Sequence, residues 1–391
     1  MIRGIFDILK RVKSAPALTR SRFPLGLHWP TFDPFLFVAH HRDHYPEANE
    51  SFGPAVSLQG RRLGMDFGGI DGWNMYHGSE VPGFPQHPHR GFETITYARH
   101  GFIDHSDSMG AIARFGRGDT QWMTAGSGVV HAEMFPLLDA DAPNPVELFQ
   151  IWLNLPRSRK MVTPYFTMNW AEHQARFSVD EVDGVETELE IVTIVGAFTG
   201  ETTTGTPIEL RAPAPPPDSW AADETAGVAI THIRMAGETG VRLRTHDHQA
   251  VYVFDGDAMN ISTADGGTDT QKGADEVVAS GTGFQPVGGV ELELSLVQGS
   301  DTAGLDGGAG DQKGYVECLI MEGRPLNEPV AQYGPFVMNT KAEISEAFAD
   351  YQSTGFGGWP WPRPDPVHGA RPERFARHPD GRTEQPPATV E

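Results

Sequence analysis

Glycine and proline interrupt this chain too often for long helices. The 391 residues include 45 Gly and 31 Pro, about one residue in five, against about 12% in average proteins. Such frequent breaks disfavour helical bundles and coiled coils and favour short strands joined by tight turns. The hydrophobic fraction of 39% suffices for a packed core, and no apolar run approaches the roughly 18 residues of a membrane span. The sequence therefore predicts an all-β protein, long enough for two domains and tails.

Charge and cysteine content narrow the function. The chain has 30 basic and 52 acidic residues and a formal charge of −22, which disfavours the clustered Lys and Arg that bind nucleic acid phosphates. Cys318 is the single cysteine, so no disulfide can form within the chain. No secretory signal with a clear apolar region opens the sequence. We therefore expect a cytoplasmic protein that does not bind nucleic acid directly.

Composition divides the chain into four segments. We expect a basic N-terminal arm, a first β-rich domain, a second β-rich domain and a helix end with a Pro- and Gly-rich tail, at residues 1–29, 30–170, 171–345 and 346–391. The arm has apolar residues at helical spacing and predicts an amphipathic segment lying on the acidic body. Contact with a membrane surface or a partner, and a targeting role, remain alternatives.

Two shorter segments have their own signatures. Residues 201–225 contain three consecutive Thr and a Pro-rich run, and we expect a long loop there. Residues 341–351 place apolar side chains on one helical face after an Asn-Thr pair suited to an N-cap, which predicts a helix. The Trp-, Pro- and Gly-rich segment that follows predicts no regular structure up to the C-terminus.

Histidine is concentrated in the first third of the chain, where ten of the 16 imidazoles lie at or before residue 131. Two pairs stand out, His87 with His89 and His131 with Glu133. Residues i and i+2 of a strand point to the same face, so each pair offers two ligands side by side. Two such strands facing each other inside a barrel could close a shell of four ligands.

Three imidazoles and one carboxylate indicate the kind of metal. This donor set suits Fe, Mn, Co, Ni, Cu or Zn better than Ca or Mg. An octahedral ion would keep two positions open for water, O2 or substrate. The pattern therefore predicts a metal site with a chemical function rather than a purely structural one.

Three blocks of sequence resemble the pirin family, a group of proteins with two cupin domains. They are HPHRGFETITY at residues 87–97, GDTQWMTAGSGVVHAEMF at 118–135, and the segment from GRPLNEPVAQYGPF to QSTGFGG at 323–358. The resemblance implies two stacked cupin barrels, that is, jelly-roll or double-stranded β-helix barrels, with a C-terminal helix and extended tails. It also implies one Fe(II) in the first barrel, held by His87, His89, His131 and Glu133.

Other residues near the two pairs allow more than one interpretation. Glu93 stands where many cupins place a glutamate ligand, and we expect it to support the metal site or the fold. Arg90 could pair with a carboxylate or steer an anionic substrate. Trp122 and Met123 could pack inside the barrel or contact a substrate in its pocket. His77 and His105 could form hydrogen bonds near the metal. Alternatively, they are exposed or hydrogen-bonded elsewhere in the fold.

The second domain contains a weaker echo of the metal pattern. His246 and His248 precede a predicted strand, and Glu291 and Glu293 follow at nearly the separation seen in the first domain. These four residues could form a second metal site. The family resemblance, however, implies metal in the first barrel only.

Three function classes follow. The resemblance implies an Fe(II)-dependent dioxygenase that cleaves flavonols such as quercetin, a small planar aromatic substrate, with O2 and releases CO; Glu133 or a nearby carboxylate would take the proton of the enolic hydroxyl. The alternatives are a redox-sensing regulator that binds a protein partner and a cupin that holds metal without turnover. We favour the dioxygenase, acting as a monomer, since no long exposed apolar face is evident.

Overall fold

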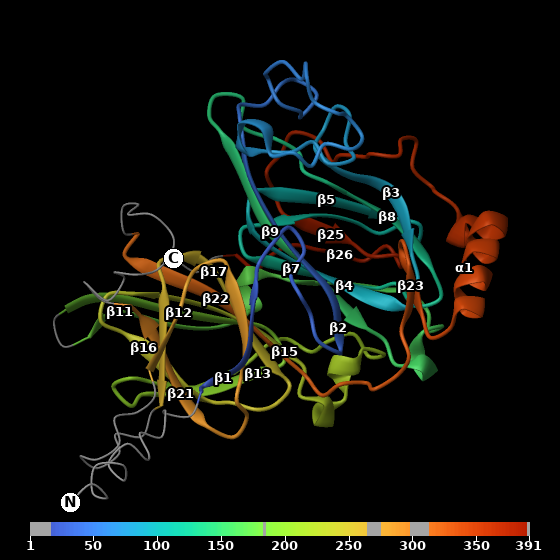
Figure 1. Cartoon of the computed structure of the whole chain (residues 1–391). Coiled ribbons are helices and arrows are strands. Elements are labelled where there is room, and N and C mark those ends of the chain that lie inside the picture. Colours follow the sequence, from blue (N-terminus) through green and yellow to red (C-terminus); the bar gives the residue numbers. More distant parts are fainter. Residues whose placement is uncertain (1–16, 183–184, 264–274, 298–312, 389–391) are drawn as a thin grey trace, which may run out of the picture.

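The structure, a computed structural model, describes residues 17–182, 185–263, 275–297 and 313–388, which form two β-barrels side by side (Figure 1). The all-β prediction is confirmed. Each barrel consists of two facing sheets. In the first barrel the described strands have the orders β10-β7-β4-β9-β2 and β26-β25-β6-β5-β8-β3. In the second barrel the orders are β1-β20-β17-β22-β15-β12-β11 and β14-β13-β16-β21-β18-β19.

The strands of the first barrel are β2 (Phe35–Tyr45), β3 (Gly83–His89), β4 (Phe92–His100), β5 (Phe102–Asp107), β6 (Ile112–Gly116), β7 (Asp119–Thr124), β8 (Val129–Met134), β9 (Asn144–Asn154), β10 (Tyr165–Asn169), β25 (Phe375–Arg377) and β26 (Thr383–Glu384). Those of the second barrel are β1 (Thr19–Pro24), β11 (Ala175–Val182), β12 (Val185–Val195), β13 (Ala197–Thr202), β14 (Pro207–Arg211), β15 (Ala229–Ala236), β16 (Gly240–Arg244), β17 (Gln249–Gly256), β18 (Met259–Thr263), β19 (Asp275–Val278), β20 (Thr282–Pro286), β21 (Glu291–Leu296) and β22 (Tyr315–Glu322). A separate hairpin, β23 (Ala331–Tyr333) and β24 (Phe336–Met338), precedes helix α1 (Lys341–Thr354). Short 3₁₀ turns lie at Ile70–Gly72, Arg157–Arg159, Ala171–His173, Trp220–Ala222, Glu224–Ala226 and Gly355–Gly357.

Strand β4 shows why the first barrel needs the second. Residues 92–98 are all buried, although alternate side chains of a strand point to opposite faces. Ile95 and Tyr97 belong to an apolar cluster that joins the two barrels and includes Val192 and Tyr252 of the second. The other face, with Thr96, lies inside the first barrel. The second barrel therefore covers a sheet that would otherwise expose an apolar face.

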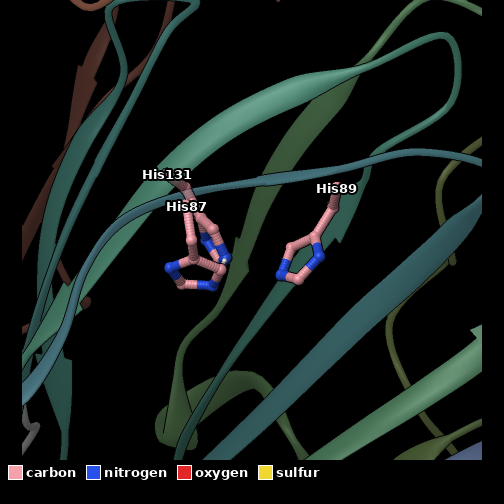
Figure 2. Close-up of side chains that lie close together, drawn as sticks. All are labelled: His87, His89 and His131. Atoms are coloured by element: carbon pink, nitrogen blue, oxygen red, sulfur yellow. Dashed lines mark hydrogen bonds between the residues drawn. The ribbon is translucent and has the colours of Figure 1, made fainter. Parts of the chain in front are cut away.

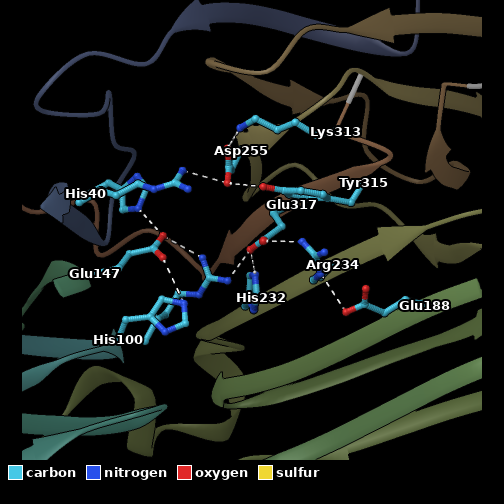
Figure 3. Close-up of polar contacts among 12 residues, drawn as sticks. His40, His100, Glu147, Glu188, His232, Arg234, Asp255, Lys313, Tyr315 and Glu317 are labelled. Atoms are coloured by element: carbon cyan, nitrogen blue, oxygen red, sulfur yellow. Dashed lines mark hydrogen bonds and ion pairs between the residues drawn. The ribbon is translucent and has the colours of Figure 1, made fainter. Parts of the chain in front are cut away.

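A buried network of charges reinforces this interface (Figure 3). Glu317 on β22 accepts a hydrogen bond from His232 Nε2 at 2.8 Å and pairs with Arg234 at 2.9 Å. Arg99 on β4 lies 2.6 Å from Glu317 and 2.8 Å from Glu147 on β9. One guanidinium thus joins carboxylates of both barrels.

Helix α1 covers the outer side of the first barrel, away from the second (Figure 1). Thr340 caps it with a capping box, since its hydroxyl accepts from the backbone N–H of Glu343 and the Glu343 carboxylate accepts from the backbone N–H of Thr340. Gly355, at φ 56°, ends it in the left-handed conformation. The helix predicted at residues 341–351 is confirmed and continues to Thr354.

The described part of the basic arm contains a strand. Residues 1–16 lie outside the described residues, and Thr19–Pro24 forms β1, antiparallel to β20 of the second barrel. Arg20 pairs with Asp247 at 3.4 Å, and Arg22 pairs with Glu276. The two arginine side chains therefore contact acidic groups of the second barrel, and the strand β1 extends the sheet of that barrel.

Two segments that we expected to lack regular structure contain strands. Residues 201–225 begin within a hairpin of β13 and β14, and only the later part is a connection with 3₁₀ turns. In the tail, β25 pairs with β6 and β26 pairs with β25. The tail covers the edge of β6, which would otherwise leave backbone groups without partners.

The chain beyond residue 330 returns to the first barrel. Phe336 forms a β-bridge with Arg90, and the Lys160 ammonium donates to the backbone oxygens of Gly91 and Val337. The expected boundary at residue 345 falls inside α1, which also packs on the first barrel. Among the described residues, no helix is long and apolar enough to cross a membrane.

Replacing Glu317 tests the interface network. Burial raises the pKa of Glu317, but the hydrogen bond from His232 and the charges of Arg99 and Arg234 outweigh burial and hold that pKa at about 2. We expect Glu317→Gln to lower the free energy of unfolding in denaturant titrations by about 3 kcal/mol, because buried cations lose their partner. Glu188→Gln, whose side chain is 43% exposed, is the control and should cost less than about 1 kcal/mol.

The low pKa of Glu317 also predicts that the stability of the protein depends on pH. The pKa of Glu317 is lower in the folded protein than in the unfolded chain, so its stabilisation is complete above the ordinary pKa of a glutamate and is lost as the pH falls toward 2. Wild type should therefore lose stability over this range more steeply than Glu317→Gln. Parallel curves for the two proteins would contradict this account.

Candidate metal centre

Two paired strands bring the predicted imidazoles together. β3 and β8 are antiparallel, and His87 lies directly opposite His131 in their register. His89 follows His87 by two residues and shares its face, as Glu133 does with His131. Figure 2 shows His87 and His131 overlapping and His89 pointing toward them from farther along its strand. The predicted i, i+2 pairs are therefore present, but β3 and β8 are hydrogen-bonded neighbours in one sheet rather than strands that face each other across the barrel.

The three imidazoles are close enough to hold one ion. One nitrogen of each of His87, His89 and His131 lies within 4.8 Å of those of the other two. The Nε2 atoms of His87 and His131 are 3.0 Å apart. His87 Nδ1–H donates to the carbonyl oxygen of Pro85 at 2.9 Å, and His89 Nδ1–H donates to that of Pro335 at 3.4 Å. Both rings therefore keep the Nε2 lone pair for a cation.

The environment fits a metal ion. Burial lowers the pKa of His87 to about 4 and the pKa values of His89 and His131 well below the usual value. Neutral imidazole is the form that binds a metal. The buried Nδ1 of His131 has no hydrogen-bond partner among the described residues, whereas its Nε2–H donates to the Nε2 lone pair of His87 at 3.0 Å. A cation bound there would take the place of this proton and bind the lone pairs of both Nε2 atoms.

Glu133 lies beside the three imidazoles rather than among them. Its Oε2 is 3.8 Å from His131 Nε2. Thr96 donates to Oε1 at 3.1 Å, and Gln150 donates to Oε2 at 3.3 Å. Burial raises the pKa of Glu133, an effect that His105 and the Thr96 hydrogen bond oppose. The carboxylate is therefore held within reach of the cluster by neighbours on the facing sheet.

His105 lies behind the cluster. It is fully buried, and its ring centre is 5.5 Å from that of His131. Gln121 donates to its Nδ1 at 2.9 Å, so its Nε2–H points at Asp107, 3.0 Å away. His105 is therefore hydrogen-bonded and lies next to the candidate metal centre, which is one of the two positions considered for it from the sequence.

An apolar cavity of ≈ 520 Å³ opens at His87 and His89, two of the three imidazoles. His87, His89 and Glu133 line it, together with the aromatic side chains of Phe37, Phe67, Phe84, Phe135 and Trp152. The lining contains no residue of the Pro-rich segment 213–217 or of the described tail. Neither of these two segments therefore fills the cavity.

Sequence analysis singled out neither Gln150 nor His41, which also line the cavity. Gln150 contacts Glu133 from β9. His41, on β2, is buried, and burial lowers its pKa to about 3. Its Nδ1 lies 2.9 Å from the hydroxyl of Tyr76, far from it in sequence. The alternation of β2 was the available signal, but it could not show which face is inside.

Several residues that we considered for the site lie elsewhere. Glu93 points to the other face of β4, where Thr124 and Ser219 donate to its carboxylate at 2.7 and 2.5 Å. Trp122 belongs to the apolar cluster between the barrels. Met123 packs with Ala125 and Val129. None of these three lines the cavity in the described structure.

Arg90 and His77 also differ from a simple site assignment. Arg90 is buried outside the cavity, donates to the Ser127 carbonyl and pairs with Asp350 of α1 at 2.8 Å. It therefore holds the helix rather than a substrate. His77 does line the cavity, but it is exposed and 2.6 Å from the Gly64 carbonyl oxygen, at the entrance.

The four residues of the considered second site do not come together. His246 pairs with Glu322 at 3.0 Å, and Glu293 pairs with Arg242 at 2.9 Å. Glu291 lies opposite Arg244 in the register of β16 and β21. Among the described residues, the three imidazoles of the first barrel are the group arranged to hold an ion, and His248 is not part of such a group.

Comparisons with known proteins agree with this architecture. The family model "Pirin" matches residues 19–153, and "Pirin C-terminal cupin domain" matches residues 292–357. Pirin-1 of Arabidopsis thaliana is 31% identical over 275 residues, covering 70% of this chain and 78% of that protein. A Pseudomonas aeruginosa protein named "Putative quercetin 2,3-dioxygenase" is 30% identical over 274 residues, covering 70% and 79%.

A solved structure shows the same fold. The crystal structure of quercetin 2,3-dioxygenase from Acinetobacter baumannii aligns with a TM-score of 0.59 and 23% identity. It covers 87% of this chain and 98% of that one. The two barrels are therefore cupin domains, as the sequence resemblance implied.

Removing one imidazole tests the centre. We expect His131→Ala to lose the bound metal while keeping its β-sheet circular dichroism, because the barrel retains its other packing and the ion loses a central ligand. Elemental analysis of protein purified without oxygen measures this. His246→Ala is the matched control, and we expect it to keep about one equivalent, as we expect of wild type. Full metal content in His131→Ala would show that the ion is bound elsewhere.

Proposed function

This chain belongs to the pirin family, and on that premise we propose that it is an iron-dependent dioxygenase that cleaves flavonols such as quercetin with O2 and releases CO. One Fe(II) would be held by His87, His89, His131 and Glu133. The observation that carries the proposal is the cavity of ≈ 520 Å³ that His87, His89 and Glu133 line. Its aromatic walls suit a flat, apolar substrate.

The donor set and the shape of the cavity support this chemistry. Three imidazoles and a carboxylate favour a transition metal and leave positions for substrate and O2. Iron bound there would lower the pKa of a substrate hydroxyl and provide an electronic path to O2. A sensor needs neither a cavity of this size nor aromatic walls, so the open cavity favours an enzyme over a redox-sensing regulator.

Each wall residue has a defined task. Glu133 Oε2 takes the proton of the enolic hydroxyl, since it is the carboxylate that lines the cavity beside His131. Thr96 and Gln150 hold that carboxylate by hydrogen bonds. Trp152 and Phe84 enclose the aromatic rings and exclude water, which strengthens polar interactions at the reacting end.

Turnover of quercetin tests the proposal. We expect iron-loaded protein to consume O2 and release CO when quercetin is added. Compared at equal iron content, Glu133→Gln should lower kcat by about 10²- to 10⁴-fold, because the proton acceptor is lost. Glu93→Gln is the matched control, because the hydrogen bonds of Glu93 lie on the face of β4 that points away from the cavity. Glu93 is also a buried carboxyl group, and burial raises its pKa to about 7. The Glu93→Gln variant should keep its turnover.

The opposite outcome has a clear meaning. Full iron occupancy without turnover of any flavonol would refute the dioxygenase and favour the regulator, whose iron state would then control binding to a protein partner. Equal turnover in wild type and Glu133→Gln would instead remove Glu133 from the proton transfer.

A further inference from the structure

A chain of hydrogen bonds ends at the wall of the cavity. Tyr76 donates its hydroxyl proton to Asp43 Oδ2 at 2.7 Å. The Tyr76 oxygen lies 2.9 Å from His41 Nδ1 and has no second proton to give, so His41 Nδ1–H donates to it. The hydrogen-bond chain therefore fixes the tautomer of His41, with a bare lone pair on Nε2.

The Nε2 atom of His41 is available to a ligand. His41 lines the cavity and is 7% exposed. Within the described part of the chain, no group donates to this nitrogen, and it is not among the fully enclosed polar atoms without partners. A buried acceptor at a cavity wall gains most from a ligand that donates a proton to it.

The surrounding chain is built to hold this arrangement. Asp43 Oδ1 accepts from both the backbone and the side-chain nitrogen of Asn74, at 2.8 and 3.0 Å. Tyr76 has φ 56°, a conformation that costs energy for a residue other than glycine. Reciprocal backbone hydrogen bonds with Asp66, each 2.9 Å, keep it there.

His41 and the metal centre serve different parts of one ligand. The ring of Phe84 lies 5.7 Å from that of His41 and 6.4 Å from that of His87, centre to centre. The His41 ring makes no ring contact with the three imidazoles in the described structure. A ligand that reaches both must extend past Phe84, so it needs more than one ring.

The charge of the cavity limits that ligand further. No Lys or Arg is among the described residues that line it. The titratable lining groups are Glu133 and the imidazoles of His28, His41, His77, His87 and His89. Away from the proposed iron, a substrate carboxylate would find no cationic side chain among these residues, whereas an uncharged hydroxyl finds an acceptor at His41.

We propose that His41 Nε2 is a specificity site that accepts a hydrogen bond from an outer hydroxyl of an uncharged, polyhydroxylated aromatic substrate, with Tyr76 and Asp43 as positioning residues. The inference rests on the proposed function, because the far end of the same ligand lies at the three imidazoles. It assigns the preference among flavonols to β2 and to the loop that carries Tyr76.

Two ligands separate this role from a structural one. Quercetin carries outer-ring hydroxyls, and 3-hydroxyflavone has the same scaffold and enolic hydroxyl without them. Dissociation constants are measured by calorimetry on iron-loaded protein under argon, where neither ligand can be turned over. We expect His41→Phe to weaken quercetin about tenfold and 3-hydroxyflavone hardly at all, since only quercetin loses a hydrogen bond.

Further variants give the test its controls. His41→Gln, which keeps an acceptor, should restore part of the quercetin affinity, and Tyr76→Phe should cause a smaller selective loss than His41→Phe. His77→Phe, at the entrance, should change both affinities by the same factor. Equal effects of His41→Phe on the two ligands, or none, would overturn the inference.

The outcome also distinguishes this inference from the proposed function. A selective loss in His41→Phe without any turnover by wild type would refute the dioxygenase and leave the specificity site standing. Turnover of quercetin with no selective loss would do the reverse. If wild type binds neither ligand, both are refuted.

Discussion

The antiparallel register of β3 and β8 is the constraint on which the candidate centre depends. It places His87 opposite His131. Two pairs of side chains, His87 with His89 and His131 with Glu133, therefore lie side by side on one face of the sheet. A shift by one residue would turn every one of these side chains to the other face. An irregularity between Phe84 and His87 lets the register change along β3. Phe84, which lines the cavity, and the imidazoles therefore lie on either side of a register shift in the same pair of strands.

The second barrel supports this register from a distance. The sheet containing β4 and β9 has one face toward the cavity and the other against the second barrel. Arg99, Glu147 and Glu317 fix that contact with buried charges. Thr96 and Gln150, which hold Glu133, therefore extend from strands that are packed on both faces. Such packing keeps the Glu133 carboxylate in place.

Much of the site could be predicted from sequence because its residues are local. His87 with His89, and His131 with Glu133, follow directly from the period of a strand. Glu93 shows the limit: the alternation of β4 was recognisable, but both of its faces are buried, so no pattern says which one lines the cavity. His41 and Tyr76 meet through a Gly-rich loop without periodicity. The strands of the tail are edge additions, and their pairing with β6 depends on tertiary contacts.

The most direct test of the central claim is a crystal structure of the iron-loaded protein, prepared without oxygen and measured at the iron absorption edge. The account predicts one strong anomalous peak among the Nε2 atoms of His87, His89 and His131, with Glu133 at the same ion. A peak at His246 and His248, or one that Glu133 and the three imidazoles do not surround, would contradict it.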